Sequence, residues 1–406
     1  MAAEEPNPAY SLIMVQDFQN ILIYEDELAR SRRFLPLTYT RCLAELRSGA
    51  LSGIERVKLA FPGKAIYLHT TTELQAVIAA RHSLPVNEVP SGVTLLLNAR
   101  DIFEKPKAER IVGDISADVA SCIVSGVPLK GADYESVNGT TSLWDIVHNN
   151  SATIGVDATL MLESGWMSID PVSIPNTFIE HPKHLMVHPT ARVSAGVVFD
   201  CTSGHIIVES GAQIYPQSTI IGPAVIGAKS IVKIGAKIYG STTIGPTSKV
   251  GGEIENSIIQ GYSNKQHDGY LGHSFIGEWC NLGAGTNTSD LKNDYSNVRV
   301  TIEGEEFDTK SMFVGLMMGD HSKSGIGVQF NTGTAVGVSC NIFDAGFPPK
   351  WIPNFSWGGA SGLTLYRYEK AMEVARKVME RRGVEMRGEE ETMVRRLFTL
   401  RTIVEL

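Results

Sequence analysis

The sequence has few cysteines and no apolar run long enough to cross a membrane. The cysteines number five and are scattered without CxxC spacing: Cys42, Cys122, Cys201, Cys280 and Cys340. Their odd number argues against a disulfide framework or a zinc site. No apolar run approaches about 18 residues, and the acidic N-terminus lacks the charged and apolar regions of a signal peptide. We therefore expect a soluble protein of the reducing cytoplasm, with no membrane segment.

Basic tracts are also missing from the sequence. Lys and Arg number 36 against 44 Asp and Glu, which gives a formal net charge of -8 at pH 7. A nucleic acid or an anionic membrane surface would attract clustered positive charge, so we expect neither as a partner. The 406 residues and the hydrophobic content of 43% are sufficient for two domains, each with its own core.

The segment from residue 18 to residue 150 alternates strand-like and helix-like patterns. "NILIY" and "AIYLHT" are short apolar runs, "TTTELQAVIAARHSL" has helical spacing, and "GVTLLLNARDIF" contains another buried strand. Strand, helix and strand in this order predict an α/β sheet, whose ligands usually lie at the carboxyl ends of the strands. Residues 1–17 are predicted to be an N-terminal tail, and residues 151–185 a connector.

A repeat of six residues follows the connector. The aliphatic residues that recur at this spacing are Val208, Ile214, Ile220, Ile226, Val232, Ile238, Ile244 and Val250. A helix would show a period of about 3.6 residues and a strand a period of 2, so neither explains the pattern. A hexapeptide repeat forms the short strands of a parallel β-helix, with the aliphatic side chain pointing inward. The alternative is a β-sandwich, which would need period-two strands and frequent turns. We predict a β-helix over residues 186–362.

The repeat is interrupted before it ends. The stretch "NKQHDGYLGHSFIGEWCNLGAGT" is predicted to be a loop that leaves the β-helix after Val250 and rejoins it at Ile276. A second insertion, "NTSDLKNDYSNVRVTIEGEEFDTKS", precedes the return of the repeat at Phe330. Insertions in repeat proteins often carry the binding face. Residues 363–406 are predicted to form two helices that pack on the coils or on a neighbouring chain.

Several polar motifs resemble a known family. "GYSNKQHDGYLG", "GEWCNLGAGTN", "MGDHSKSGI" and "FLPLTYTRCLAELRSG" are similar to the GlmU-like sugar nucleotidyltransferase family. Its relatives are the bifunctional N-acetylglucosamine-1-phosphate uridylyltransferase/glucosamine-1-phosphate acetyltransferase and other sugar-1-phosphate nucleotidylyltransferases. The resemblance extends from about residue 18 to about residue 382. It implies a degenerate nucleotidyltransferase-like, Rossmann-like α/β domain over residues 18–150 and a left-handed, acyltransferase-like β-helix over residues 186–362.

The resemblance implies an acetyltransferase site around His267. In the bifunctional enzyme the histidine of the H-x-x-Y-L-G stretch is the proposed general base, and His267 occupies that position. A neutral imidazole, with an unperturbed pKa of about 6.5, can accept the proton that a glucosamine amine loses as it attacks an acetyl thioester. The alternative is that His267 is a loop histidine that only satisfies backbone groups.

Four more residues are implied to bind the substrate. Tyr270 matches a tyrosine that contacts the sugar phosphate, and Glu253 matches a glutamate that contacts the sugar. Asp290 stands where the family has an asparagine, so it keeps an acceptor and loses the amide donors. Lys292 matches a basic residue that would contact phosphate. Glu255 replaces the phosphate-binding lysine of the bifunctional enzyme, which leaves the identity of the aminosugar open.

The N-terminal half lacks the glycine-rich loop of active nucleotidyltransferases. No glycine lies between Asp17 and Gly49, so the backbone cannot approach a triphosphate in the usual way. Arg41 is retained and is implied to bind the nucleotide through its side chain. Nearby arginines could assist it: Arg30, Arg32 and Arg33. Asp101 lies near the position of the Mg²⁺-binding aspartate, and Asp145 is a second metal candidate.

Three functions follow from the resemblance. The first is acetyl-CoA-dependent N-acetylation of an aminosugar-1-phosphate such as glucosamine-1-phosphate, by a homotrimer with sites between adjacent β-helices. The second is transfer of a nucleotidyl group from UTP or dTTP to a sugar-1-phosphate in the N-terminal domain, with Mg²⁺. The third is a catalytically inactive trimer that binds sugar nucleotides or acts as a scaffold.

Overall fold

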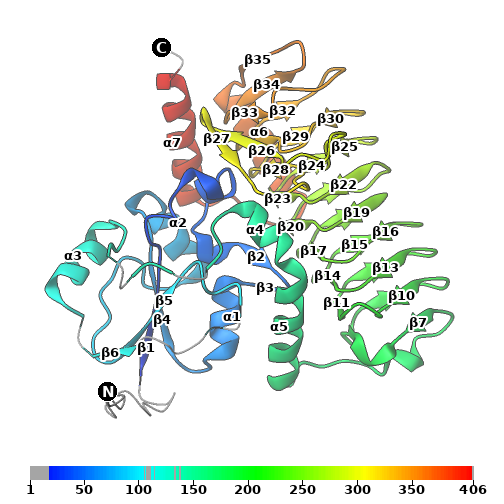
Figure 1. Ribbon diagram of the computed structural model, residues 1–406, viewed down its shortest axis with the longest axis horizontal. Coiled ribbons are helices and arrows are strands. Elements are labelled where there is room, and N and C mark those ends of the chain that lie inside the picture. The colour runs from blue at the N-terminus through cyan, green and yellow to red at the C-terminus, as the bar shows by residue number, and fades with distance from the viewer. Residues whose placement is uncertain are drawn as a thin grey trace, which may run out of the picture.

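The computed structural model describes residues 18–404 except 105, 107–110, 114, 132–133 and 137–138. The predicted tail over residues 1–17 lies outside the described residues. Figure 1 shows an α/β domain packed against the side of a tall stack of β-strands, with the C-terminal helix beside the upper strands. The predicted two-part organisation is therefore visible, while its residue boundaries remain predictions.

The N-terminal domain is built on a sheet with the strand order β4-β1-β5-β6. Its strands are β1 (Asn20–Tyr24), β4 (Ala65–His69), β5 (Thr94–Asn98) and β6 (Ile111–Val112). β1 pairs in parallel with β4 and β5, and β6 pairs antiparallel with β5. β1 and β5 are buried along their whole length, as parallel strands covered on both faces should be. The predicted α/β sheet is confirmed.

Helices and short segments complete this domain. Its α-helices are α1 (Gly53–Ala60), α2 (Thr72–His82), α3 (Ala117–Ser125) and α4 (Leu143–His148). Short 3-10 turns follow β1: η2 (Arg32–Phe34), η3 (Leu37–Tyr39) and η4 (Leu43–Glu45). The small hairpin of β2 (Arg47–Ser48) and β3 (Leu51–Ser52) precedes α1. The segment between β1 and β2 thus contains the turns that replace a glycine-rich loop.

Residues 178–365, all of which the structure describes, contain the long parallel sheets of the β-helix. The first face consists of β7 (Phe178–Glu180), β10 (Val198–Asp200), β13 (Thr219–Ile221), β16 (Lys237–Ile238), β19 (Glu253–Glu255) and β22 (Tyr270–Gly272). The second face consists of β8 (Leu185–Val187), β11 (Ile206–Val208), β14 (Ala224–Ile226), β17 (Thr242–Ile244), β20 (Ile258–Gly261), β23 (Phe275–Glu278), β28 (Met317–Met318), β31 (Ala335–Val336) and β33 (Trp351–Ile352).

The third face runs beside the other two. It consists of β9 (Arg192–Val193), β12 (Gln213–Ile214), β15 (Ile231–Val232), β18 (Lys249–Val250), β21 (Asn264–Lys265), β24 (Asn281–Leu282), β29 (Lys323–Ser324), β32 (Asn341–Ile342), β34 (Ser356–Gly359) and β35 (Gly362–Leu365). Each strand pairs in parallel with its equivalent in the next coil, except that β34 and β35 are antiparallel. The first strands, β7 and β8, begin before residue 186, where the β-helix was predicted to start.

The aliphatic residues of the six-residue repeat form the core of the β-helix. All eight, from Val208 to Val250, are buried in one cluster. Ile226 and Ile244 illustrate the packing, because they are direct partners on neighbouring strands of the second face. Side chains that recur at one position of each coil therefore stack into a column, as the repeat predicts. The predicted β-helix is confirmed.

The stretch that was predicted to loop out after Val250 stays in the β-helix. β19, β20, β21 and β22 pair with the strands of the preceding coil. Ile254, Ile259 and Leu271 are buried in the same aliphatic column. The prediction of a loop was wrong because a change in turn length shifts the spacing in the sequence without interrupting the parallel pairing of the strands.

The second insertion does leave the β-helix, as predicted. β26 (Arg299–Ile302) and β27 (Glu305–Asp308) form an antiparallel hairpin. The coil resumes at β28, which pairs with β23, and β30 (Gln329–Phe330) then pairs with β25 (Asn287–Thr288). The hairpin contributes Val300, Ile302 and Phe307 to the core that it shares with the N-terminal domain.

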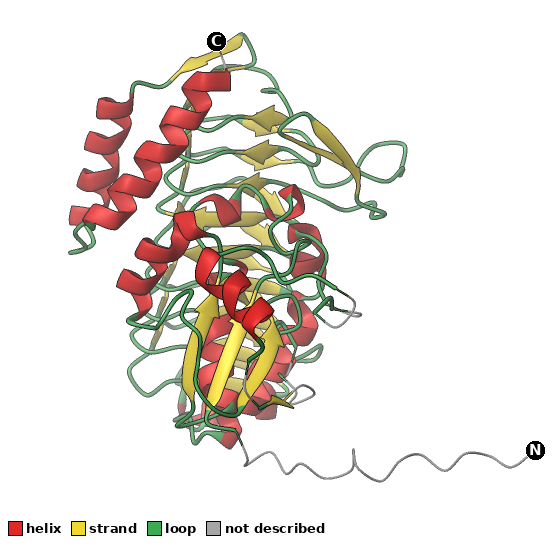
Figure 2. Ribbon diagram, turned by 90° about the vertical axis from the view of Figure 1, so that its left-hand side faces the viewer, coloured by secondary structure: helices red, strands yellow, loops and turns green. Residues whose placement is uncertain are grey.

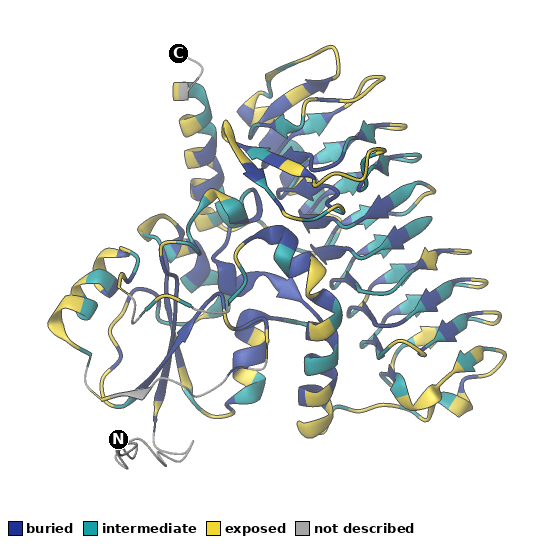
Figure 3. Ribbon diagram, viewed as in Figure 1, coloured by how far each residue is buried: buried dark blue, intermediate teal, exposed yellow. Residues whose placement is uncertain are grey.

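Helices connect the two parts of the chain. α5 (Asn150–Glu163) lies within the predicted connector and packs against α1, β14 and β17, beside the lower coils in Figure 1. The 3-10 turns η5 (Pro171–Ser173) and η6 (Pro182–His184) follow it. Figure 3 shows buried residues concentrated where the N-terminal domain meets the coils, whereas turns on the far side of the β-helix are exposed. The second face of the β-helix is therefore covered by the N-terminal domain.

The chain ends in the two predicted helices, α6 (Tyr368–Glu380) and α7 (Gly388–Val404), which lie side by side in Figure 2. They were expected to pack on the coils or on another chain. They do pack on the coils: the ring of Phe355 in the β-helix lies 6.2 Å from that of Tyr368 in α6 and 5.1 Å from that of Phe398 in α7. In addition, α7 packs against α2 of the N-terminal domain, with Arg81 bound to Glu390 and Arg396 bound to Glu73. All five cysteines are free thiols. Within the described residues, no helix has both the length and the hydrophobicity that crossing a membrane requires.

Glu45 makes the stability of the N-terminal domain dependent on pH. Burial raises the pKa of this carboxylate, but Arg81 and His82 outweigh burial and lower the pKa to about 2. The Nη1 atom of Arg81 lies 3.3 Å and the Nε2 atom of His82 lies 2.9 Å from Oε1 of Glu45. Because this pKa is below the ordinary value of 4.5, the stabilisation by Glu45 is complete at neutral pH and is lost as the pH falls from 4.5 towards 2.

We expect Glu45→Gln to lower Tm at pH 7 and to flatten the decrease of Tm between pH 4.5 and pH 2. Calorimetry over a pH series measures both effects. Glu306→Gln is the matched control, since Glu306 forms its ion pair with Arg299 on the surface. If Tm of the Glu45 variant decreases between pH 4.5 and pH 2 as steeply as Tm of the unaltered protein, Glu45 is not the group that makes the stability depend on pH.

Candidate functional site

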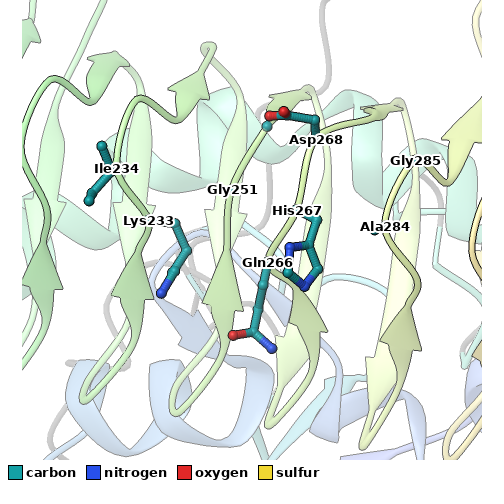
Figure 4. A pocket seen from close by; sticks show the side chains of 9 residues that line it. Lys233, Ile234, Gly251, Gln266, His267, Asp268, Ala284 and Gly285 are labelled. Carbon is teal, nitrogen blue, oxygen red and sulfur yellow. The ribbon is translucent and has the colours of Figure 1, made fainter.

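An open groove lies at the corner where the chain turns from the third face to the first face of the β-helix. Its volume is ≈ 410 Å³, and its lining includes Lys233, Gly251, His267, Asp268 and Ala284. These residues occupy the turns that follow β15, β18, β21 and β24, so adjacent coils present them next to one another (Figure 4). The stacking of the β-helix thus assembles a site from segments separated in sequence.

The imidazole of His267 is an exposed group in this groove. In Figure 4 the ring lies between the turns that carry Gly251 and Ala284, and the carboxylate of Asp268 points away from it. Among the described residues, none forms a hydrogen bond or an ion pair with the His267 ring. A ligand can therefore reach the ring nitrogens directly.

Glycines keep the floor of the groove open. A Cβ atom on Gly251 would lie 2.4 Å from the carbonyl oxygen of Gln266. Gly252 has a φ of +70°, and a Cβ atom there would lie 2.8 Å from the carbonyl oxygen of His267. Both positions exclude larger residues, because real contacts of a Cβ atom are longer than this. A ligand in the groove would therefore lie directly on the backbone beside His267.

Lys233 supplies positive charge to the groove, and the sequence did not reveal it. Figure 4 shows the side chains of Lys233 and Gln266 extending to the same side of the corner as the His267 ring. The Nζ atom of Lys233 lies 5.3 Å from the centre of the Tyr215 ring. Lys233 follows the inward residue Val232, so in the sequence it resembles any outward residue of the repeat. Only the stacking of coils places it near His267.

Tyr270 and Asp290 lie in a separate polar cluster. The hydroxyl of Tyr270 is 3.1 Å from Oε2 of Glu255 and 3.0 Å from Oδ2 of Asp290. Nδ1 of His273 is 2.7 Å from the same Asp290 oxygen. Burial and the two carboxylates raise the pKa of Tyr270, so its hydroxyl stays protonated. Neither Tyr270 nor Asp290 lines the groove of His267 within one chain, and their roles with substrate remain predictions.

Glu253 and Lys292 also have local partners. Oε2 of Glu253 is 3.9 Å from Nζ of Lys237 on the neighbouring strand of the first face. Nζ of Lys292 donates to the carbonyl oxygen of Asn297 at 2.6 Å and to Ser296 at 3.3 Å, and thereby stabilises its own loop. Neither residue borders the groove, so their predicted contacts with a substrate stay predictions.

Two of the arginines expected to assist at a triphosphate, Arg32 and Arg33, contact the β-helix hairpin. Nε of Arg32 lies 2.7 Å from Oε2 of Glu303, and its Nη1 lies 3.1 Å from Oε2 of Glu305. The guanidinium of Arg33 stacks over the ring of Phe307 at 5.1 Å. The segment that replaces the glycine-rich loop therefore joins the N-terminal domain to the insertion between β25 and β30.

Arg41 has ion-pair partners in the β-helix, and its predicted contact with a nucleotide remains a prediction. Its side chain is 2% exposed, and its Nη2 atom lies 2.5 Å from Oδ2 of Asp320 and 3.3 Å from Oε2 of Glu278, both in the β-helix. The guanidinium borders a cavity of ≈ 270 Å³ that is covered by Met393 and Leu397 of α7. Arg41 is thus held between two carboxylates of the other domain, because the chain folds the N-terminal domain onto the coils.

Two buried carboxylates follow β1, where a phosphate-binding loop would begin. Glu25 accepts the backbone N–H of Leu43 at 2.7 Å and the hydroxyl of Thr70 at 2.8 Å. Asp26 lies 2.6 Å from Nη2 of Arg100. Burial raises the pKa of Glu25. Nε of Arg30 lies 3.5 Å from Oε2 of Glu25, so both carboxylates have partners within the N-terminal domain.

The predicted metal residues show no assembled metal site. Asp101 accepts a hydrogen bond from Ser136, and Asp145 accepts the backbone N–H of Thr141 at 3.0 Å. Over the part of the chain that the structure describes, no group of three or more His, Cys, Asp or Glu side chains is placed to hold a metal ion. A role of Asp101 with Mg²⁺ therefore remains a prediction.

The fold and the groove together define a class of protein. An α/β domain is joined to a parallel β-helix with three faces. Residues 21–123 match the family model described as sugar nucleotidyl transferase. This match agrees with the resemblance of the motifs to the GlmU-like sugar nucleotidyltransferase family.

Individual relatives agree with this family. The chain is 35% identical to the bifunctional protein GlmU of Methanococcus aeolicus over 197 residues, which is 48% of this chain and 43% of the relative. It is 30% identical to the GlmU protein of Methanococcus maripaludis over 250 residues, 60% of this chain and 59% of the relative. A bifunctional sugar-1-phosphate nucleotidylyltransferase/acetyltransferase of Sulfurisphaera tokodaii is 30% identical over 142 residues, 34% of this chain and 35% of the relative. The matched regions cover less than two thirds of each relative.

Proposed function

We propose that the protein is an acetyl-CoA-dependent N-acetyltransferase that acts on an aminosugar-1-phosphate, with His267 as the general base. The observation that carries this proposal is the exposed His267 ring in a groove with a backbone floor. The sugar nitrogen attacks the carbonyl carbon of the thioester while a His267 ring nitrogen removes the amine proton. A C–N bond forms, the C–S bond breaks, and the thiolate of coenzyme A leaves and is protonated.

Lys233 could bind the sugar phosphate in place of the lysine that Glu255 replaces. Glu255 stands at the position of that lysine and lies beside Tyr270, away from the groove. Lys233 lines the groove itself, and an ammonium group is a suitable partner for a phosphate. We therefore assign the sugar phosphate to Lys233.

A homotrimer would complete the site. The His267 ring has no orienting partner among the described residues of its own chain, so a neighbouring chain would supply one. Ile234 in the groove is 66% exposed, and Ile326, at the equivalent turn of a later coil, is 85% exposed. Exposed aliphatic side chains along one edge support an interface at this corner. The five free thiols support a reducing, cytoplasmic location.

Release of the thiol from acetyl-CoA in the presence of aminosugar-1-phosphates tests the proposed function. Glucosamine-1-phosphate, its isomers and unphosphorylated glucosamine form the panel. We expect thiol release that requires both the amine and the phosphate. A panel without any turnover, measured on protein that binds sugar nucleotides, would instead support the binding or scaffold function.

Nucleotidyl transfer is the second candidate, and the family match over residues 21–123 favours it. The contacts of Arg32 and Arg41 with the β-helix oppose it. We expect no release of pyrophosphate above background from UTP or dTTP with sugar-1-phosphates and Mg²⁺. Release of pyrophosphate at an ordinary enzyme rate, about 1 s⁻¹ or faster, would make nucleotidyl transfer the first candidate in place of acetyl transfer.

A further inference from the structure

A lysine occupies an inward position of the aliphatic column directly beneath the groove. Lys265 lies in β21 in register with Val250 of the preceding coil, and it is 3% exposed. Its neighbour on the other side is β24, whose inward residue is Leu282. Burying a lysine among aliphatic side chains is costly, because the ammonium loses its hydration. The β-helix by itself would be served better by an apolar residue at this position.

The ammonium of Lys265 is bound to the turn that carries His267. Its Nζ atom donates to the carbonyl oxygen of His267 at 2.6 Å and to that of Gly251 at 3.1 Å. Burial lowers the pKa of Lys265 to about 8, so the group remains charged at neutral pH. Both carbonyls belong to residues that line the groove. The contacts therefore link the turn of the proposed base to the turn of the coil before it.

Gly252 provides the space that this arrangement requires. A Cβ atom at Gly252 would lie 2.9 Å from Nζ of Lys265. The ammonium thus reaches the underside of the groove floor, where no side chain separates it from the backbone. A residue other than glycine would displace either the lysine or the turn.

Lys323 shows that such a contact also exists away from the groove. Lys323 lies in β29 on the same face, and its Nζ atom donates to the carbonyl oxygen of His321 at 2.7 Å. Burial lowers its pKa to about 8 as well. It does not border the groove, so it is a chemically matched control for Lys265.

We propose that Lys265 is a positioning residue for His267: its buried ammonium holds the turn so that the imidazole faces the acceptor amine. This inference rests on the proposed acetyl transfer. The lysine does not touch the substrate, and it acts through the backbone of His267. A methionine at this position could fill the aliphatic column without the cost of burying a charge. The proposed positioning of His267 explains why a lysine lies beneath this turn.

Substitution of Lys265 tests this proposal on the full-length protein. We expect Lys265→Met to lower kcat for thiol release by about 10- to 100-fold, because small displacements of a catalytic group have effects of this size. The KM for acetyl-CoA should change by less than about twofold, and Tm should not fall. Lys265→Gln keeps an amide donor and should retain more activity than Lys265→Met. Lys323→Met should retain the kcat of the unaltered protein.

A second measurement does not depend on turnover. NMR of protein with labelled histidine should show a displaced His267 ring resonance in Lys265→Met and an unmoved one in Lys323→Met. Unchanged kcat, or an unmoved His267 resonance in folded Lys265→Met protein, overturns the proposal. If the unaltered protein releases no thiol while Lys265→Met still displaces the resonance, the positioning contact stands and the acetyltransferase function fails. If Lys265→Met does not fold, the same two readouts are applied to Lys265→Gln.

Discussion

Replacing His267 with alanine should lower kcat for thiol release by about 10²- to 10⁴-fold, the usual contribution of a general base. The ring is exposed in the groove, and its removal leaves the groove backbone unchanged, so the KM for acetyl-CoA should stay within about twofold. Steady-state kinetics with the aminosugar-1-phosphate that gives the fastest turnover measures both values.

His181 is the matched control for this experiment. It is another exposed histidine of the β-helix, located next to its first coil and far from β21 in the sequence. His181→Ala should retain the unaltered kcat. Thiol release that persists at the original rate in His267→Ala would show that another group removes the amine proton.

Replacing Arg41 with methionine should produce the largest loss of stability among the variants considered. Asp320 is 3% exposed, and it would be left without its guanidinium partner in the junction between the two domains. Removing one member of a buried ion pair costs about 3–5 kcal/mol, because the other charge stays buried without compensation. Denaturant titration followed by circular dichroism measures the change in the free energy of unfolding. Arg41→Met/Asp320→Asn should lose less, because the double variant leaves no unpaired charge at that carboxylate.

Arg32 provides the surface comparison for Arg41. It also connects the domains through an ion pair, but the side chains of Arg32 and Glu303 are 50% and 38% exposed. Exposed pairs contribute about 0–1 kcal/mol, so Arg32→Met should reduce the free energy of unfolding by no more than that. If Arg41→Met is as stable as Arg32→Met and has lost affinity for UTP, the prediction that Arg41 binds a nucleotide is supported.

The β-helix could be predicted because its core repeats in sequence. Ile226 and Ile244 are eighteen residues apart, and the structure places them on neighbouring strands of one face. The coil between Val250 and Ile276 was misread, since Ile254 and Ile259 depart from the spacing of six while their strands remain paired. A periodicity detects a repeat only while the turns have equal length, whereas the hydrogen bonds between coils tolerate turns of different length.

The candidate site could be predicted only in part. The motif around His267 identified the residue that lies exposed in the groove. Tyr270 follows it closely in sequence and was expected to share its site, but the chain turns a corner between them, so the Tyr270 hydroxyl lies beside Glu255. Lys233 was not predicted, because it is far from His267 along the chain. The two residues come close only when the coils stack.

The sequence by itself determined the class of fold, the position of the repeat and the residue that is the strongest candidate for a base. These features are local or periodic, so a linear pattern contains them. Only the tertiary structure decided that Arg41 joins the domains, that Lys265 lies in the aliphatic column and that Lys233 borders the groove. The position of each of these side chains depends on which coil or domain lies next to it. That arrangement is determined by packing contacts between residues that are far apart in the chain.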